Sequence, residues 1–362
     1  MTQDPGLASW LQLTLTPGLG AAAIRGLLQQ FGLPKNILAA TRSQLERAAG
    51  PAAAQLLRPE QIAPAIERAL RWAQEPGHAV VTLADAAYPR LLLEIPDPPP
   101  LLYAVGRTKL LGQPSLAVVG SRNATAQGLR DAEQFSKAFS AAGLTIVSGL
   151  ALGIDAAAHR GGLAAEGSTI AVLGTGVDVT YPRQNAPLAA QIAESGLLVS
   201  EFPLGTGGAA HHFPRRNRLI SGLTQGCLVI EAALASGSLI TARTAADQGR
   251  EVFALPGSIH SPLSKGCHAL IKQGAKLVES AEDLLAELTA FRRIGYASTR
   301  TTAETPAPPD ALLAHMGFDP VDLDSLCVRA GLPAEHVSAE LLRLELAGRI
   351  AALPGGLYQR LS

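Results

Sequence analysis

The 362-residue sequence has no excess of either charge, because 30 Lys and Arg residues are balanced by 30 Asp and Glu residues. A neutral chain gives no whole-molecule electrostatic argument for or against nucleic acid, so such an argument must rest on local clusters. Cysteine is scarce: Cys227, Cys267 and Cys327 lie far apart and form no Cys-x-x-Cys pair. This scarcity argues against a disulfide framework and a cysteine zinc site, and it fits a reducing cytoplasm.

Long uninterrupted apolar segments are also missing. Residues 5–23 carry no charge, but Asp4 precedes them, and Pro17, Gly18 and Gly20 interrupt them, so they fit neither a signal peptide nor a membrane span. Hydrophobic residues make up 47% and charged residues 17% of the chain, which excludes disorder as the main state and favours two or three folded domains. We expect a cytoplasmic protein with no membrane contact.

The first 77 residues have helical periodicity. Apolar residues such as Leu11, Leu15 and Leu19 recur at helical spacing, and residues 17–20 (Pro-Gly-Leu-Gly) separate two such runs. We predict a helical domain over residues 1–77, with the helix-hairpin-helix type as one candidate. In that type the N–H groups of a Gly-x-Gly turn contact a DNA phosphate. An ordinary helical hairpin turn explains the same residues equally well.

Residues 78–289 alternate apolar runs of strand length with stretches that are compatible with helices. Continuous apolar strands separated by helices indicate a parallel sheet covered on both faces. Right-handed crossovers then give a doubly wound, Rossmann-like α/β domain. Two earlier runs, residues 79–83 and 101–105, are further candidate strands. The six strands predicted for the parallel sheet lie at residues 116–119, 144–147, 170–173, 197–200, 228–230 and 252–255.

The end of the chain has a different character. Residues 290–309 are rich in Thr, Pro and Ala, which predicts a linker. Residues 310–362 show three amphipathic runs and then a hairpin pattern, which predicts a winged-helix domain. This domain carries four Arg and seven Asp or Glu residues, a net charge of −3. Because a winged helix that binds DNA needs a basic face, we expect this one to contact protein instead.

Ligands of a doubly wound sheet bind at the carboxyl ends of its strands, and small, anion-binding residues gather at those ends in this sequence. Glycine lets the backbone approach a ligand, N–H groups at helix starts hold phosphate, and arginine supplies two donors at once. Several such turns on one sheet edge predict a row of phosphates. The residues expected to bind them are Gly120, Ser121, Arg122, Ser148, Gly149, Gly237 and Ser238.

Residues 211–218 contain the sharpest cluster of charge, with Arg215, Arg216 and Arg218 close to Phe213. The cluster lies between the fourth and fifth of the six strands, so we expect it at the same sheet edge. The arginines would follow a nucleic-acid backbone, and Phe213 would stack on a base. A solvated, salt-bridged loop is the alternative explanation.

Other motifs give weaker signals. The dinucleotide fingerprint Gly-x-Gly-x-x-Gly and the P-loop motif are both absent, and no metal cluster is recognisable, so we expect neither a cofactor nor a metal. Asp155 and His159 lie four apart on a predicted helix, where they fit a hydrolytic pair or a helix cap with an internal hydrogen bond. Glu231 is either a catalytic carboxylate or a residue that holds a neighbouring serine or arginine.

Four motifs together resemble the DprA (Smf) family, the DNA-processing proteins of natural transformation. The resemblance is specific over about residues 88–287. It is weaker in the flanks, which look like that family's N-terminal helical (sterile-alpha-motif-like) domain and C-terminal winged helix. One departure concerns residues 205–214, which contain no Lys, whereas the family often has one near the arginine motif. The motifs are Gly120-Ser121-Arg122, Ser-Gly-Leu-Ala-x-Gly-Ile-Asp-x-x-x-His at 148–159, Phe-Pro-x-Arg-Asn-Arg at 213–218, and Glu-Ala-x-x-x-Ser-Gly-Ser-Leu at 231–239.

The resemblance implies a non-enzymatic protein that binds single-stranded DNA in its Rossmann-like domain. It also implies that the protein protects incoming strands, loads the RecA recombinase during natural transformation and works as a homodimer through the Rossmann-like domains. For the dimer surface we expect the apolar residues Leu270, Ile271 and Leu277, for which core packing is the alternative. Duplex DNA, bound by the N-terminal domain, is a further candidate partner.

Two other functions stay open on the sequence. The middle domain also resembles the lysine-decarboxylase-like phosphoribohydrolases, which are nucleotide-processing enzymes with a Pro-Gly-Gly-x-Gly-Thr loop followed by a glutamate. Here Glu231 comes before the small residues of its loop, so the order is altered. The remaining alternative is a scaffold in which the winged helix binds a partner and the Rossmann-like domain dimerises.

Overall fold

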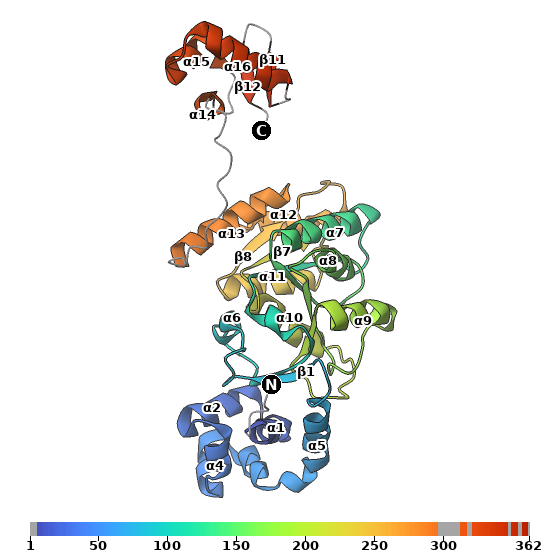
Figure 1. The fold of residues 1–362 in the computed structure, drawn as a ribbon. Helices are drawn as coiled ribbons and strands as arrows, with labels where there is room; N and C mark the ends of the chain where they lie inside the picture. The colour runs from blue at the N-terminus through green and yellow to red at the C-terminus, as the bar shows by residue number, and fades with distance from the viewer. Residues whose placement is uncertain (1–5, 296–311, 317–320, 347–348, 354–356, 361–362) are drawn as a thin grey trace. The chain divides into compact units, whose positions relative to one another are not determined.

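The computed structural model describes residues 6–295, 312–316, 321–346, 349–353 and 357–360. The chain divides into two compact units, Met1–Gly295 and Tyr296–Ser362, and each is described by itself (Figure 1). Within the described residues, no helix is long and apolar enough to cross a bilayer.

The first unit begins with short helices, namely α1 (Leu7–Leu15), α2 (Ala21–Phe31), α3 (Pro34–Leu38), α4 (Arg42–Ala49) and α5 (Ala63–Trp72). Helices α1 to α4 enclose a small apolar core of their own, whereas α5 packs in the cluster that contains residues of the sheet. The predicted turn at residues 17–20 joins α1 to α2, with Gly18 at a φ of 76°. Trp10 and Leu11 of α1 belong to a second apolar cluster, which also contains Tyr103 of the sheet. The helical segment is therefore packed directly against the sheet.

The described part of the first unit contains a nine-stranded sheet in the order β1-β2-β6-β5-β4-β3-β7-β8-β9. From β6 to β9 all neighbours are parallel, whereas β2 pairs antiparallel with both β1 and β6. All six predicted strands of the parallel sheet are confirmed. The strands are β1 (His78–Thr82), β2 (Leu101–Gly106), β3 (Ser115–Gly120), β4 (Thr145–Ser148), β5 (Thr169–Val172), β6 (Leu197–Ser200), β7 (Gly226–Ile230), β8 (Glu251–Ala254) and β9 (Lys276–Leu277).

Helices cover both faces of this sheet, which confirms the doubly wound, Rossmann-like architecture (Figure 1). In β3, Leu116 and Val118 pack on the side of α7, α8 and α13, whereas Ala117 and Val119 pack on the side of α10, α11 and α12. This alternation explains why the central strands show continuous apolar runs, with Ser or Thr only at their ends. The helices are α6 (Arg90–Leu93), α7 (Ala126–Ala141), α8 (Ile154–Leu163), α9 (Ala186–Ser195), α10 (His212–Gly222), α11 (Ser238–Asp247), α12 (Lys265–Lys272) and α13 (Ala281–Gly295).

The second unit is the predicted winged helix. Its three strands pair antiparallel in the order β10-β12-β11, and Leu326, Val337 and Leu341 lie in its apolar core. Because α13 continues to Gly295, the first six residues of the segment expected as a linker are helical, and residues 296–309 lie outside the described residues. The elements are α14 (Leu313–Met316), β10 (Val321–Asp322), α15 (Leu323–Ala330), α16 (Ala334–Leu346), β11 (Ile350–Leu353) and β12 (Leu357–Arg360).

Candidate nucleic-acid interface

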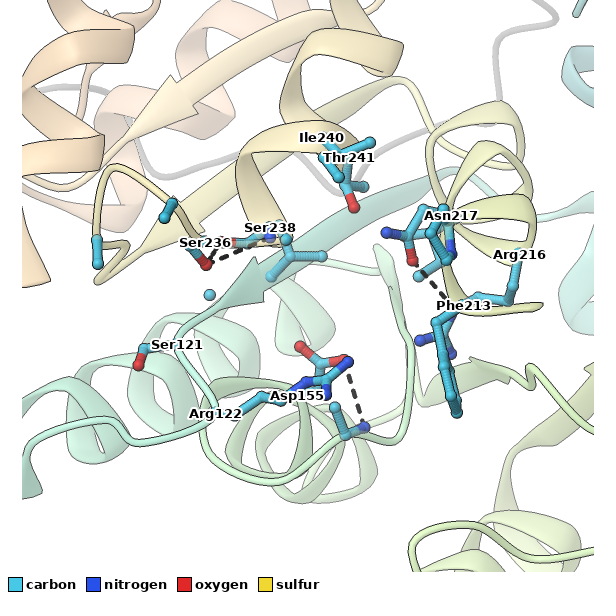
Figure 2. A pocket seen from close by; sticks show the side chains of 18 of the residues that line it. Ser121, Arg122, Asp155, Phe213, Arg216, Asn217, Ser236, Ser238, Ile240 and Thr241 are labelled. Carbon is cyan, nitrogen blue, oxygen red and sulfur yellow. Dashed lines mark hydrogen bonds between the residues drawn. The ribbon is translucent and has the colours of Figure 1, made fainter. Parts of the chain in front are cut away.

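A pocket of about 810 Å³ opens at the carboxyl ends of β3 and β7, where open α/β sheets bind their ligands. Its lining comes from the segment after β3, the start of α8, one face of α10 and the loop that leads from β7 into α11 (Figure 2). The pocket brings together seven of the residues predicted from the sequence, namely Gly120, Ser121, Arg122, Phe213, Arg216, Gly237 and Ser238.

The Gly-Ser-Arg turn after β3 contributes one available cation to the pocket. A Cβ atom on Gly120 would lie 1.9 Å from the Ile230 carbonyl oxygen, so only glycine fits between β3 and β7 here. The backbone N–H of Ser121 donates to the Glu231 carbonyl at 2.7 Å, which leaves only the Ser121 hydroxyl for a ligand. Arg122 is exposed and forms no ion pair with any described residue.

The start of α11 forms another part of the lining. Gly237 is the N-cap residue, and no side chain caps the helix. The Ser236 and Ser238 hydroxyls lie 2.7 Å apart, and the Ser238 N–H donates to Ser236 Oγ at 3.3 Å. The N–H groups of Leu239 and Ile240 donate to the Ser236 and Gly237 carbonyl oxygens, both at 3.1 Å, so the serine hydroxyls and the positive end of the helix dipole are what this segment offers an anion. Arg122 and the α11 start are thus two candidate anion-binding groups in one pocket.

Arg216 lines the same pocket but is buried, with 4% of its surface exposed. Its Nη1 donates to the carbonyl oxygens of Gly149, at 2.5 Å, and Val172, and its Nε donates to Asn217 Oδ1 at 3.1 Å. Burial lowers the Arg216 pKa to about 10, against the attraction of Asp155. Arg216 therefore joins the ends of β4 and β5 to α10 rather than extending into solvent.

The turn after β4 uses its own donors within the fold. The N–H groups of Gly149 and Ala151 donate to Asp155 Oδ2 at 3.1 and 3.4 Å, and the Leu150 N–H donates to His159 Nε2 at 3.2 Å. The Ser148 hydroxyl donates to the Val118 carbonyl at 2.7 Å. The expected phosphate contacts of Ser148 and Gly149 are therefore not provided, because these groups already have internal partners.

Asp155 and His159 are buried and bond to the loop after β4, but neither caps α8, because its N-cap residue is Gly153 and no side chain caps it. The His159 Nδ1 lies 2.7 Å from Thr169 Oγ1, which itself donates to the Ile146 carbonyl. Nδ1 must therefore be the donor and Nε2 the acceptor, which makes the imidazole neutral. Burial lowers the His159 pKa to about 3. Burial also raises the pKa of Asp155, against the opposing effects of Arg216 and the loop amides.

Arg215 and Arg218 do not reach the pocket, contrary to the expectation of one basic groove. The segment is the start of helix α10 and not a loop, so at 3.6 residues per turn they lie away from Phe213 and Arg216. Both donate to Glu201 Oε2, at 3.0 and 2.5 Å. Arg218 also donates to the Asp97 carbonyl at 2.5 Å, and the Asp97 carboxylate pairs with Arg25 of α2.

Comparison with known proteins agrees with this arrangement. Residues 79–289 match the sequence profile of DNA recombination-mediator protein A, and residues 297–356 match the DprA winged helix domain. The chain belongs to the DNA recombination-mediator protein A family. It is 47% identical to Protein Smf of Escherichia coli over 305 residues, which cover 82% of this chain and 81% of that protein. It is 50% identical to DNA processing protein DprA of Streptococcus pneumoniae over 206 residues, 57% of this chain and 73% of that one.

Two solved structures extend the likeness to three dimensions. The crystal structure of DprA from Streptococcus pneumoniae superposes with a TM-score of 0.70 at 40% identity, over 77% of this chain and 97% of that one. DprA from Helicobacter pylori, whose structure describes a single-stranded DNA binding mode, gives a TM-score of 0.54 at 30% identity. That match covers 59% of this chain and 96% of the other.

Within this member of the family, Glu231 has a structural position. Its carboxylate accepts hydrogen bonds from the Thr125 N–H at 2.8 Å and the Thr125 hydroxyl at 2.5 Å, at the start of α7. Glu231 does not line the pocket, so the catalytic carboxylate of the phosphoribohydrolase alternative lacks support. No group of three or more metal-ligating side chains occurs among the described residues.

Sequence reasoning missed other lining residues of this family member, namely Asn123, Tyr181, Asn217, Ile240 and Thr241. Asn217 lies inside the basic motif, so its position next to Arg216 could have identified it as a pocket residue. The segment that lacks the family lysine contributes Gly208 and Ala210, and the only charged side chains in the lining are those of Arg122, Arg216 and Asp155. Because Arg216 is buried and used within the fold, Arg122 carries the available positive charge among the described lining residues.

Proposed function

We propose that this chain is a single-stranded DNA-binding recombination mediator that protects incoming strands and loads a RecA-type recombinase in the cytoplasm. One observation carries the proposal: an exposed arginine without an acidic partner, an aromatic ring and an uncapped helix start share one pocket at the sheet edge. Sequence-independent binding of a single strand needs phosphate sites and stacking surfaces rather than contacts to base edges. The single-stranded DNA binding of the Helicobacter pylori relative supports the same function.

A salt titration of binding to a labelled dT oligonucleotide tests this proposal. We expect Arg122→Ala to weaken binding and to lower the slope of log K against log salt by about 0.7, the contribution of one phosphate on a single strand. Arg215→Ala is the matched control, because Arg215 is half-exposed, pairs with Glu201 and lies outside the pocket. Unchanged binding in Arg122→Ala, or equal losses in both variants, would reject the site.

We also propose that the chain works as a homodimer through the edge of the sheet at β9. Leu277 of β9 is 48% exposed, and Ile271 of α12 is partly buried, so both are available to a second copy. Leu270 is only 6% exposed and belongs to the core, which favours the packing explanation for that residue. Sedimentation of Leu277→Arg checks this proposal, since a dimer that uses this edge should dissociate.

Recombinase loading and the role of the winged helix need separate assays. Loading should appear as faster assembly of a RecA filament on a strand that is already coated with single-strand-binding protein. For the acidic winged helix we keep protein contact as the proposed role. A chain truncated after Gly295 should retain the strand affinity of the full chain, and a marked loss of affinity would contradict this assignment.

A further inference from the structure

A second, smaller cavity of about 90 Å³ adjoins the large pocket. Five residues line both cavities, namely Arg122, Ala151, Tyr181, Phe213 and Arg216. Leu152 and Pro182 complete its apolar side. Tyr181 belongs to none of the motifs identified in the sequence, yet it lines both cavities.

The Tyr181 and Phe213 rings form a pair across two segments of the chain. Their centroids lie 5.4 Å apart with the planes inclined by 36°. Phe213 comes from the first turn of α10, whereas Tyr181 comes from the segment between β5 and α9. Aromatic pairs at this separation attract each other, so each ring helps to fix the position of the other.

Two glycines make room for this pair. A Cβ atom on Gly174 would lie 2.9 Å from Cδ1 of Phe213, and one on Gly208 would lie 3.3 Å from Cδ2 of Tyr181. Neither glycine has a positive φ, so the ring contacts rather than the backbone conformation restrict both positions. The Gly205 N–H donates to Asp178 Oδ1 at 2.8 Å, which ties the segment that carries Tyr181 to the segment that leads into α10. The positions of the two rings are therefore restricted by close contacts with the backbone.

The surroundings of the two rings differ. Phe213 is contacted by Tyr181, by the backbone at Gly174 and by Arg122, whose Cζ lies 5.8 Å from the ring centroid. Tyr181 keeps 50% of its surface exposed, and its hydroxyl forms no hydrogen bond with a described residue. A flat, half-exposed ring in the same cavity as a cationic side chain suits a nucleotide, because the base can stack on the ring while the phosphate pairs with the cation.

We propose that Tyr181 is the base-stacking residue of this interface. One base of the bound strand lies on the exposed face of the Tyr181 ring. Phe213 packs against Tyr181 and holds the ring in position, and Arg122 binds the adjoining phosphate. The inference rests on the proposed function and adds the chemical class of the contact, a nucleobase recognised by its π-face. Because every base has such a face, the contact is tolerant of sequence.

The test compares Tyr181→Leu, Tyr181→Phe and wild-type full-length protein on two labelled strands of equal length, one of dT and one abasic. We expect Tyr181→Leu to bind the dT strand about 5- to 150-fold more weakly, the usual range for loss of one stacked base. Tyr181→Phe should bind like the wild type. On the abasic strand all three proteins should bind equally, and the salt slope should not change.

Each alternative outcome overturns the inference. Unchanged dT binding in Tyr181→Leu removes the stacking role, and equal loss on both strands shows that the variant disturbs the pocket instead. A loss in Tyr181→Phe that matches the leucine variant assigns the contact to the hydroxyl. Failure of the underlying function looks different, because the wild type itself would then show no salt-dependent binding to either strand.

Discussion

Replacing Arg216 by methionine should lower the free energy of unfolding of the first unit by about 1–3 kcal/mol for each of the two buried carbonyl oxygens that lose their donor. The guanidinium is almost completely buried, and it donates to the carbonyl oxygens at the ends of β4 and β5. Methionine fills a similar volume but supplies no donor, so two buried carbonyls lose a bond and the Asp155 carboxylate loses its cation. Since domains are typically stable by about 5–15 kcal/mol, this loss is a large fraction of the total.

Urea unfolding followed by tryptophan fluorescence measures this change directly. The chain has two tryptophans, Trp10 and Trp72, and both lie in the first unit, so the signal does not depend on the winged helix. Arg215→Met is the matched control on the same helix. Its side chain is half-exposed, so its pair with Glu201 should contribute about 0–1 kcal/mol.

The double variant Arg216→Met/Asp155→Asn separates charge from packing. Removing the carboxylate as well should restore part of the lost stability, and contacting residues typically couple by about 0.5–3 kcal/mol. The single variant should also be least impaired at low pH, where Asp155 is protonated. A stability of Arg216→Met within about 0.5 kcal/mol of the wild type, together with a lower salt slope for strand binding, would refute the buried role and make Arg216 a phosphate ligand.

Three further changes test other parts of the structure. The folded state holds His159 neutral, with a pKa of about 3. Between that pH and about 6.5 the unfolded chain binds one more proton, so the free energy of unfolding falls as the pH drops through this window, by up to about 1.4 kcal/mol per pH unit. In His159→Gln, the free energy of unfolding measured with urea should lack this one-proton component. Gly120→Ala should strongly destabilise the first unit in the same assay, whereas Gly237→Ala, with no atom within 4 Å of the new Cβ, should leave stability nearly unchanged. Asp322→Ala removes the side chain that accepts from the Ser325 N–H at 2.8 Å and should cost the winged helix about 1 kcal/mol, as measured by circular dichroism melting.

The parallel sheet was predictable because burial on both faces leaves a direct mark on the sequence. Val118 and Val119 face opposite sides of β3, yet both are buried, so the run is apolar without alternation. The direction in which β1 and β2 join the sheet leaves no such mark, because a short buried strand is apolar whether it runs parallel or antiparallel to its neighbour. A strand of two residues, such as β9, is too short to show any periodicity.

The candidate site was only partly predictable. Gly120 and Arg122 follow a clear strand end, so their place on the sheet edge could be inferred from topology. The arginine cluster was only partly placed, because its position between two strands was used without the period of the helix that it begins, although Pro214 in the first turn of a helix is compatible with α10. Because this segment is a helix with 3.6 residues per turn, Arg216 and Arg218 lie on different faces of α10. Tyr181 could not be found, since its exposure and its ring partner depend on tertiary contacts that no local motif encodes.

Helix α10 contacts both the pocket and the segment that binds the N-terminal helices, and this affects how truncated forms of the protein should be interpreted. One face supplies Phe213 and Arg216 to the pocket, while Arg218 on another face binds Asp97, which in turn pairs with Arg25 of the N-terminal helices. The N-terminal helices are thereby linked through Asp97 to the helix that carries two of the pocket residues. Removal of the first 77 residues would leave Asp97 without Arg25, so a trimmed sheet domain would lack one of the contacts behind α10 that the intact protein has.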